Sequence, residues 1–482
     1  MLSLLMVALP LLFAALAPLL RKREQALFSL LPLAGVCLCL LSGATLLFPE
    51  RDLYSFYIGP NLVLATDATN SFFLQVTSGL FLAVAIHAFF WLPTAQKHST
   101  YRAQGIRIMH RYLFVMFLLA FVSMMNLSIL AAHFGLMWVA IEATTLASAP
   151  LILFYCTEGA LEAMWKYLLI CSLGIGLALF GILLLAYAGK VSPNPPASLS
   201  FADLIAAGTV FHPVWYKLAF VFCLAGFGTK MGLAPFHTWL PDAHSEAPAP
   251  ISALLSGALL NCCLLAIIRV LRLAPEVVLP LCKTLLAVLG TLSVLVAAFL
   301  IIRQRDFKRM LAYSSIEHMG LCALLLCYCQ EVLHTHVVAH SITKMMLFLL
   351  AGNILVGFNT TSVRSVTALF TCMPRTGILW LFGLFAICGT PPSPLFVTEF
   401  ILIANMPPLL SFLILVLLLI IFAGMSATFI SMTTGTPLSA CAERESALAD
   451  ADAERLTIVP GAAALTILTL GFIAISWMKD LL

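Results

Sequence analysis

The feature that most limits the fold of this chain is a succession of long apolar stretches from one end to the other. Fourteen can be counted, from residues 2–20 to residues 456–478. A helix of about 20 residues crosses the roughly 30 Å hydrocarbon core of a bilayer. With 62% hydrophobic and only 10% charged residues, the chain has too few polar side chains to cover a soluble fold. The sequence therefore predicts an all-α, polytopic membrane protein with about 14 transmembrane helices.

The distribution of positive charge predicts how these helices are oriented. If the N-terminus faces outward, the loops after odd-numbered helices carry fifteen of the 25 lysines and arginines, and the other loops carry seven. Short cytoplasmic loops are enriched in these residues. We therefore expect both termini on the outer, periplasmic side. The net charge of +4 is spread over the loops without a basic block, which argues against nucleic acid as a partner.

Six charged residues fall inside the apolar stretches themselves. They are Glu142, Lys166, Lys230, Glu317, Lys344 and Glu399. An isolated charge at the centre of a membrane helix costs about 2.5–3.5 kcal/mol on insertion scales, so we expect these side chains to be paired and to have a function. Lys166 lies near the cytoplasmic end of its helix, where a long side chain can instead reach the headgroup region.

Two of these charges lie beside predicted breaks in a helix. The residues expected to break the two helices are Gly232, Pro235, Gly389, Pro391 and Pro392. Lys230 comes just before the first break, after about 14 residues or about 21 Å of helix, and Glu399 follows the second break. A charge beside an interrupted helix is typical of ion sites in transporters, because the break frees backbone carbonyls and helix ends.

The positions of the two breaks predict an internal repeat. The helix order over residues 112–271 recurs over residues 280–430, with the break at the same place in each. Five helices per unit is an odd number, so the second unit must be inverted relative to the first. We expect a three-helix segment with a basic cytoplasmic loop (1–111), the first repeat (112–271), the inverted repeat (280–430), and a cytoplasmic loop with the final helix (431–482).

A stripe of titratable side chains is predicted on one helix. His336, His340 and Lys344 are spaced four residues apart, so they share one helix face, and we call them the histidine–lysine stripe. His318 lies on the preceding helix. Neutral histidine both donates and accepts, and its pKa is near physiological pH, so the stripe is suited to proton transfer. In the alternative, His336 only caps its helix and His340 bonds a neighbouring carbonyl.

Four motifs resemble the antiporter-like membrane subunits of complex I, of Mrp-type sodium/proton antiporters and of membrane-bound group 4 [NiFe] hydrogenases. The motifs are Gly226-Phe-Gly-Thr-Lys230, Trp138-Val-Ala-Ile-Glu142, Ser315-Ile-Glu317-His318 and His340-Ser-Ile-Thr-Lys344. The variants Ala140-Ile-Glu142-Ala-Thr-Thr, Trp165-Lys166-Tyr and Leu260-Asn261-Cys are most similar to component F of hydrogenase-4, a formate hydrogenlyase-type complex. The resemblance covers roughly residues 100–405.

The resemblance implies roles for individual residues. Glu142 would form an ion pair with Lys230, and the histidine–lysine stripe would form a central relay toward Glu399. Asn261 stands where many relatives have a lysine or histidine, and because an amide does not titrate, water would have to fill that gap. The residues expected to act in proton translocation are Glu142, Lys166, Lys230, Asn261, His318, His336, His340, Lys344 and Glu399.

No cofactor is expected on this chain. Its 14 cysteines contain no Cys-x-x-Cys, which argues against iron–sulfur and structural zinc sites. Asp242, His244 and Glu246 alternate as metal ligands would, but alternate positions of a Pro-rich loop can also face water, and we expect no metal there. By the resemblance, NiFe and Fe–S centres would lie on partner subunits.

The leading hypothesis is a non-catalytic, proton-translocating subunit of a membrane-bound [NiFe] hydrogenase or formate hydrogenlyase-type complex in a bacterial or archaeal cytoplasmic membrane. Its partners would be other membrane subunits, a peripheral redox arm and protons. Four alternatives stay open: an Mrp-like sodium/proton antiporter subunit, a complex I subunit, a subunit of a proton-gradient-driven inorganic-carbon uptake complex, and a structural anchor that translocates nothing.

Overall fold

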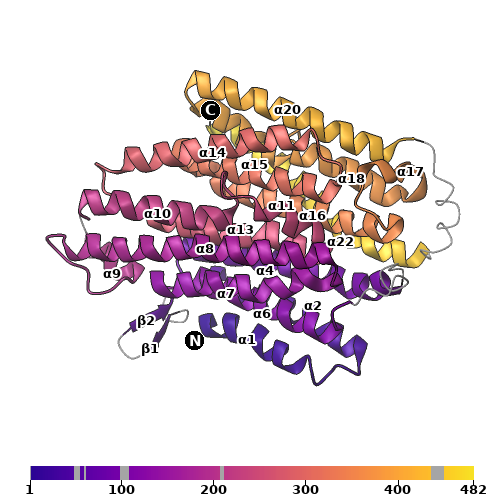
Figure 1. Cartoon of the computed structure of the whole chain (residues 1–482), viewed down its shortest axis with the longest axis horizontal. Coiled ribbons are helices and arrows are strands. Elements are labelled where there is room, and N and C mark those ends of the chain that lie inside the picture. Colours follow the sequence, from indigo (N-terminus) through magenta and orange to yellow (C-terminus); the bar gives the residue numbers. More distant parts are fainter. Residues whose placement is uncertain are drawn as a thin grey trace.

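The computed structural model describes residues 2–47, 55–58, 61–97, 108–206, 211–435 and 450–481. Its long helices lie nearly side by side along the longest axis of the molecule (Figure 1). Eleven helices in these ranges are long and apolar enough to cross a membrane, and three further apolar helices are shorter. The predicted polytopic, helical membrane fold is confirmed. The number of 14 helices and the inverted repeat stay predictions.

The elements of the N-terminal region and the first half are α1 (Leu2–Leu16), α2 (Glu24–Leu47), β1 (Phe56–Ile58), β2 (Asn61–Leu64), α4 (Ala68–Lys97), α6 (Arg111–Leu130), α7 (Phe134–Ile152), η1 (Leu153–Tyr155), α8 (Glu158–Lys190), α9 (Phe201–Ala206), α10 (Pro213–Met231) and α11 (Trp239–Glu246). The later elements are α12 (Ala249–Leu254), η2 (Leu255–Leu259), α13 (Leu260–Arg272), α14 (Leu279–Ile301), α15 (Phe307–Tyr328), η3 (Gln330–Val332), α16 (Leu333–Phe358), η4 (Val363–Ser365), α17 (Leu369–Cys372), α18 (Pro374–Ile387), α19 (Pro394–Asn405), α20 (Pro408–Thr433) and α22 (Asp450–Leu481). The antiparallel β1–β2 hairpin is a short addition that hydropathy does not predict.

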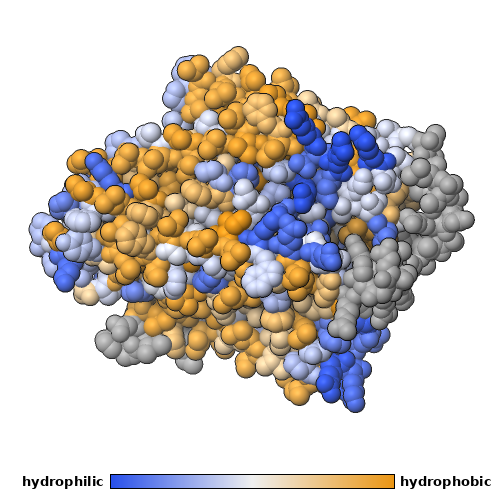
Figure 2. All heavy atoms as spheres, viewed as in Figure 1, coloured by the Kyte–Doolittle hydropathy of each residue, from blue (hydrophilic) through white to orange (hydrophobic). Residues whose placement is uncertain are grey.

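Central and outer helices differ in what they face. The most apolar window of Ala249–Arg272 is 100% buried and that of α15 is 94% buried, whereas that of α20 is only 28% buried. The outer helices expose apolar side chains such as Leu173 and Leu419. Figure 2 shows hydrophobic residues over most of one face, with hydrophilic residues gathered mainly toward the right-hand end. This pattern fits a bundle whose flanks lie in lipid and whose ends meet water.

The break after α10 is built so that its freed backbone groups are satisfied. Gly232 ends the helix in a left-handed conformation (φ +86°), which favours glycine because it lacks a Cβ. The indole of Trp239 donates to the carbonyl of Thr229 at 2.8 Å, and the N–H of Ala234 donates to the Ser293 hydroxyl at 2.9 Å. The chain therefore leaves the helix inside the bundle without exposing unpaired groups to lipid.

A second break separates α18 from α19. Gly389 also has a left-handed conformation (φ +58°), and a Cβ at this position would overlap with the carboxyl group of Glu399. Ser393 closes both helix ends, because its hydroxyl donates to the carbonyl of Ala386 at 2.9 Å and accepts from the N–H of Leu395 at 3.2 Å. The break therefore holds a carboxyl group directly against its glycine.

Candidate functional site

The first buried charge cluster surrounds Lys230 in the last turn of α10. The side chain is fully buried, and its ammonium donates to the hydroxyls of Thr145 on α7 at 2.6 Å and Tyr167 on α8 at 2.8 Å. The ammonium also lies 4.6 Å from the centre of the Tyr167 ring, within cation–π range. Tyr167 continues the network to Ser148 at 2.7 Å. The charge is held by hydroxyl groups from two neighbouring helices.

Glu142 reaches Lys230 through an intermediate. Its carboxylate accepts from Ser172 at 2.7 Å and from Thr145 at 3.5 Å. The ion pairs among the described residues do not include Glu142 with Lys230, so the direct ion pair that the resemblance implies is not present. The reason is local, since Thr145 lies one helical turn after Glu142 on the same face. Its hydroxyl can accept from Lys230 and donate to Glu142 at the same time.

Lys166 lies apart from this buried cluster. Its side chain is 46% exposed and pairs with Glu162 at 2.6 Å and with Asp242 at 3.0 Å. Asp242 also pairs with Arg309 of α15 at 2.6 Å. The structure therefore places Lys166 in a half-exposed ion-pair network rather than among the buried side chains.

The segment with Asp242, His244 and Glu246 is the helix α11, so the loop expected from its prolines is wrong. His244 is buried and stacks on Phe348 with ring centres 4.8 Å apart, while Asp242 takes part in ion pairs. Alternate positions on a helix point in different directions, so the three side chains do not converge. No group of three potential metal ligands is found in the part of the chain that the structure describes.

The middle of the bundle is occupied by a π-helical turn. This turn, η2, joins α12 to α13, and such turns often occur at functional sites. Asn261 follows it, and its amide donates to the carbonyl of Gly257 at 2.7 Å and to the hydroxyl of Ser341 on α16 at 2.9 Å. Because Ser341 is next to His340 in the sequence, Asn261 contacts the helix that carries the histidine–lysine stripe. Its side-chain oxygen has no hydrogen-bond partner among the described residues.

The second buried charge cluster surrounds Lys344 on α16. Its ammonium donates to the carbonyl of Leu311 at 2.7 Å and to the hydroxyl of Ser314, both on α15. Glu317, one turn further along α15, is buried and interacts with Lys344 electrostatically. The ion pairs among the described residues do not include these two groups, so they interact through space inside the bundle without direct contact.

A continuous hydrogen-bonded chain runs from the second break through two histidines. The hydroxyl of Thr398 lies 2.8 Å from Nδ1 of His336, Nε2 of His336 lies 3.3 Å from Nδ1 of His318, and Nε2 of His318 lies 3.1 Å from the carbonyl of Ile387. Thr398 precedes Glu399 on α19, and Ile387 is the last residue of α18. The chain thus begins and ends at the two sides of the break.

The partners of this chain fix how protons are arranged on neutral rings. A carbonyl only accepts, so His318 carries its proton on Nε2 and accepts at Nδ1 from Nε2–H of His336. Nδ1 of His336 then accepts from Thr398. The Thr398 hydroxyl has a second acceptor in the carbonyl of Leu395 at 2.9 Å. If it turns to Leu395, its oxygen can accept from a protonated His336, so the site accommodates an extra proton by one rotation.

His340 is placed beside this chain without joining it. Its ring centre lies 5.0 Å from that of His318, and neither of its nitrogens has a hydrogen-bond partner among the residues described. The alternative in which His340 bonds a neighbouring carbonyl stays open, because the backbone of Ser256 lies close to its ring. His336 does not merely cap its helix, because it bonds across to α15 and α19.

Several residues that take part in this interior were missed from the sequence. Lys308 and Arg269 were counted as loop charges, but both are buried. Lys308 donates to the carbonyls of Ser245 and Ala247 at the end of α11, at 2.8 and 2.5 Å. Arg269 donates to the carbonyl of Ala131 at 2.8 Å. Both lie at helix ends, where only the three-dimensional packing tells a buried charge from an exposed one.

The chain is similar to proteins of a known membrane family. Residues 131–431 match the family model described as NADH:quinone oxidoreductase/Mrp antiporter, transmembrane. The chain is 34% identical over 407 residues to the Hydrogenase-4 component F homolog of Methylacidiphilum infernorum, covering 80% of this chain and 85% of that protein.

Two solved structures show the same fold. One is the membrane-bound sulfane sulfur reductase, an archaeal respiratory membrane complex, with a TM-score of 0.80 and 21% identity over 99% of this chain and 96% of the other. The second is respiratory complex I of Thermus thermophilus, with a TM-score of 0.71 and 24% identity over 99% of both chains.

Proposed function

The chain belongs to the NADH:quinone oxidoreductase/Mrp antiporter transmembrane family, and from this membership we propose that it moves protons through the membrane along its buried polar side chains. The complex we propose is a membrane-bound [NiFe] hydrogenase of the formate hydrogenlyase type. What supports this choice is the 34% identity over most of the chain to a protein named as a hydrogenase-4 component F homolog. In this proposal the redox chemistry, with its NiFe and Fe–S centres, takes place on partner subunits.

The single observation that carries the proposal is the set of buried titratable groups with hydrogen-bonded neighbours. Lys230, Lys344 and the three histidines are fully buried, and Glu317 and Glu399 nearly so. Groups of this kind are costly inside a membrane and mark ion pathways and proton relays. A structural anchor has no use for them.

The proposed path has two hydrogen-bonded parts. The first runs from Glu142 through Thr145 to Lys230 and Tyr167. The second runs along the histidine chain to Thr398, beside Glu399. Protons transfer along such chains when each member can both donate and accept, as hydroxyls and imidazoles do.

Between the two parts, protons must cross the region of Asn261 and His340. Asn261 does not titrate, and its amide bonds to Ser341, the residue after His340 on α16. The side-chain oxygen of Asn261 and both ring nitrogens of His340 are buried without a hydrogen bond of good geometry among the described residues. Buried polar atoms without partners are costly, and water that makes two to four hydrogen bonds is their usual partner. In the proposal, water here completes the path.

Exchange between charged partners would drive the proton onward. Lys344 has a carboxyl neighbour in Glu317, and Lys230 has one in Glu142 by way of Thr145. Moving a carboxylate toward or away from an ammonium changes their electrostatic interaction energy by several kcal/mol at low dielectric. A change of this size is enough to switch the lysine between holding and releasing its proton. Conformational change in partner subunits would supply that movement.

The proposal includes a cellular setting. The chain would lie in a bacterial or archaeal cytoplasmic membrane with both termini periplasmic, as the excess of lysine and arginine in alternate loops supports. It would bind other membrane subunits and, through them, a peripheral redox arm. Lys166, in its half-exposed ion-pair network, would act at the cytoplasmic entrance to the path.

Sodium/proton exchange is the second candidate. The family description includes Mrp antiporters, and the second break brings the Glu399 carboxyl group against Gly389, where carboxyl and backbone oxygens are ligands that a hard cation prefers. Replacing sodium by choline in the transport assay separates the two, since only sodium exchange requires the ion.

The test is to purify the chain with its native partners, identify them by mass spectrometry, and reconstitute the complex in vesicles with a pH-sensitive dye. We expect nickel–iron hydrogenase subunits to copurify and redox turnover to drive proton uptake in choline medium. A complex of small antiporter subunits, with transport that needs sodium, would support the second candidate instead.

A further inference from the structure

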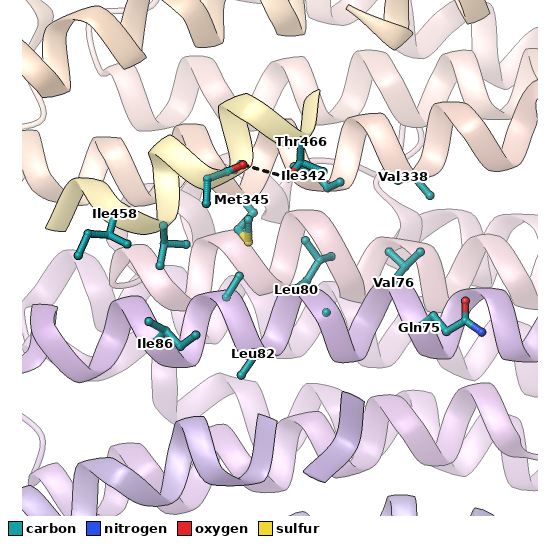
Figure 3. A pocket seen from close by; sticks show the side chains of 15 residues that line it. Gln75, Val76, Leu80, Leu82, Ile86, Val338, Ile342, Met345, Ile458 and Thr466 are labelled. Carbon is teal, nitrogen blue, oxygen red and sulfur yellow. Dashed lines mark hydrogen bonds between the residues drawn. The ribbon is translucent and has the colours of Figure 1, made fainter. Parts of the chain in front are cut away.

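An apolar cavity of about 460 Å³ lies between α4, α16 and α22, at the edge of the bundle. Figure 3 shows side chains from all three helices around it, among them Leu80 and Ile86 of α4, Ile342 of α16 and Ile458 of α22. The hydroxyl of Thr466 donates to a carbonyl of its own helix at 2.9 Å, drawn as a dashed line in Figure 3. The cavity therefore offers hydrocarbon contacts along most of its length.

The space exists because small residues face one another across it. Gly79 and Ala83 of α4 lie opposite Ala462 and Ala463 of α22 in the cavity lining. A Cβ added at Gly79 would meet no atom within 4 Å. Membrane helices that pack tightly bring their small residues into close contact. Here the small residues of α4 and α22 leave a groove between the two helices instead.

A second cavity, of about 340 Å³, lies further along α4, at the start of α22. It is lined by Phe89, Phe90 and Pro93 of α4 and by Arg455 of α22, with residues of α2. Ile86 of the first cavity comes one helical turn before Phe90 on the same face of α4. The two cavities therefore lie in line along α4 and α22, and we call them together the α4–α22 groove, which is apolar along most of its length and has an arginine at one end.

The end of the groove at the start of α22 carries a positive charge. Arg455 is exposed and makes no ion pair within the described ranges, and neither cavity is lined by an acidic residue. A guanidinium has a planar fork of donors that matches a phosphate group, with which it forms charge-assisted hydrogen bonds. The groove thus combines a phosphate-binding group with a hydrocarbon slot.

The dimensions of the slot match one leaflet of a bilayer. From Gln75 to Ile86, α4 rises about 16 Å, and half the hydrocarbon core is about 15 Å thick. An apolar cavity of about 150 Å³ holds one benzene, so the volume of the first cavity is enough for roughly 18 carbons. These values correspond to one acyl chain of a phospholipid.

We propose that the α4–α22 groove binds a membrane phospholipid, with one acyl chain between α4 and α22 and its phosphate on Arg455. The chain would pack against Ile342 and Met345 of α16, which flank Lys344 in the sequence. The acyl chain would thereby cover the outer side of α16, the helix that carries the histidine–lysine stripe. It would keep water away from that side of the stripe.

The test uses the purified native complex in detergent and phosphatidylglycerol with a photoreactive group at the middle of one acyl chain. After illumination, we expect labelled peptides from α4 and α22, around Leu80 and Ala462. Gly79→Leu, which fills the slot, and Arg455→Gln, which removes the phosphate partner, should each lower labelling about tenfold. That corresponds to about 1.4 kcal/mol of binding free energy.

Two matched variants serve as controls. Gly176→Leu adds the same bulk on α8, where a Cβ also meets no atom within 4 Å, and Arg364→Gln removes another exposed arginine. Both should label as the wild type does, and inorganic phosphate should not compete. Labelling of a partner subunit instead of α4 and α22 would assign the groove to a protein helix. Equal labelling of Gly79→Leu and the wild type would also overturn the proposal.

Discussion

The most informative perturbation of the first cluster is Thr145→Val, which removes one hydroxyl and keeps the shape of the side chain. In the structure this hydroxyl accepts from Lys230 at 2.6 Å and donates to Glu142 at 3.5 Å. A hydrogen bond to a charged group contributes about 1.5–3 kcal/mol, and 1.4 kcal/mol is a factor of ten. We therefore expect the rate of proton uptake to fall about 10- to 100-fold.

The assay is the initial rate of dye quenching in vesicles that contain the reconstituted complex, divided by the rate of redox turnover in the same sample. Thr145→Ser keeps the hydroxyl and should retain most of the uptake. Thr428→Val removes a hydroxyl that bonds only within α20 and should change nothing. A Thr145→Val complex that pumps at the wild-type rate would show that the link between Glu142 and Lys230 does not carry protons.

Three further predictions follow from other contacts. Thr398→Val should lower proton uptake at least tenfold, because His336 loses the partner that accommodates an extra proton; Thr398→Ser should restore it, and uptake unchanged by Thr398→Val would refute the histidine chain. A high-resolution map should show ordered water between Asn261 and His340, and a dry gap would exclude this route. Gly226→Ala should destabilise the protein by about 1–3 kcal/mol, seen as a lower Tm, because its Cβ would overlap with Ala178 of α8, whereas Gly176→Ala should leave Tm unchanged.

Local chemistry made the helix breaks predictable from the sequence. Glycine and proline act within a few residues, so the end of α10 beside Lys230 and the gap between α18 and α19 before Glu399 could both be located. The spacing of His336 and His340 likewise determined that they share a face. Hydropathy sufficed for the membrane fold because lipid requires long apolar helices.

Contacts between distant helices could not be derived in this way. Thr145 lies on the same helix face as Glu142, and this spacing was the one sequence signal that it could link Glu142 to Lys230. Nothing in the sequence indicated that Tyr167 of another helix would accept a hydrogen bond from Lys230. Thr398 bonds to His336 across 62 positions in the chain. Lys308 was misassigned because a charge at a helix end has the same sequence signature whether it is buried or exposed.

The central claim is that buried titratable side chains carry protons through this subunit, and Lys230→Ala tests it most directly. The measurement is the number of protons taken up per redox turnover in vesicles with the intact complex, with subunit content checked by mass spectrometry and Glu142→Gln measured alongside. The account predicts an assembled complex in which coupled proton uptake is lost in both variants. An assembled complex that takes up as many protons per turnover as the wild type would contradict it.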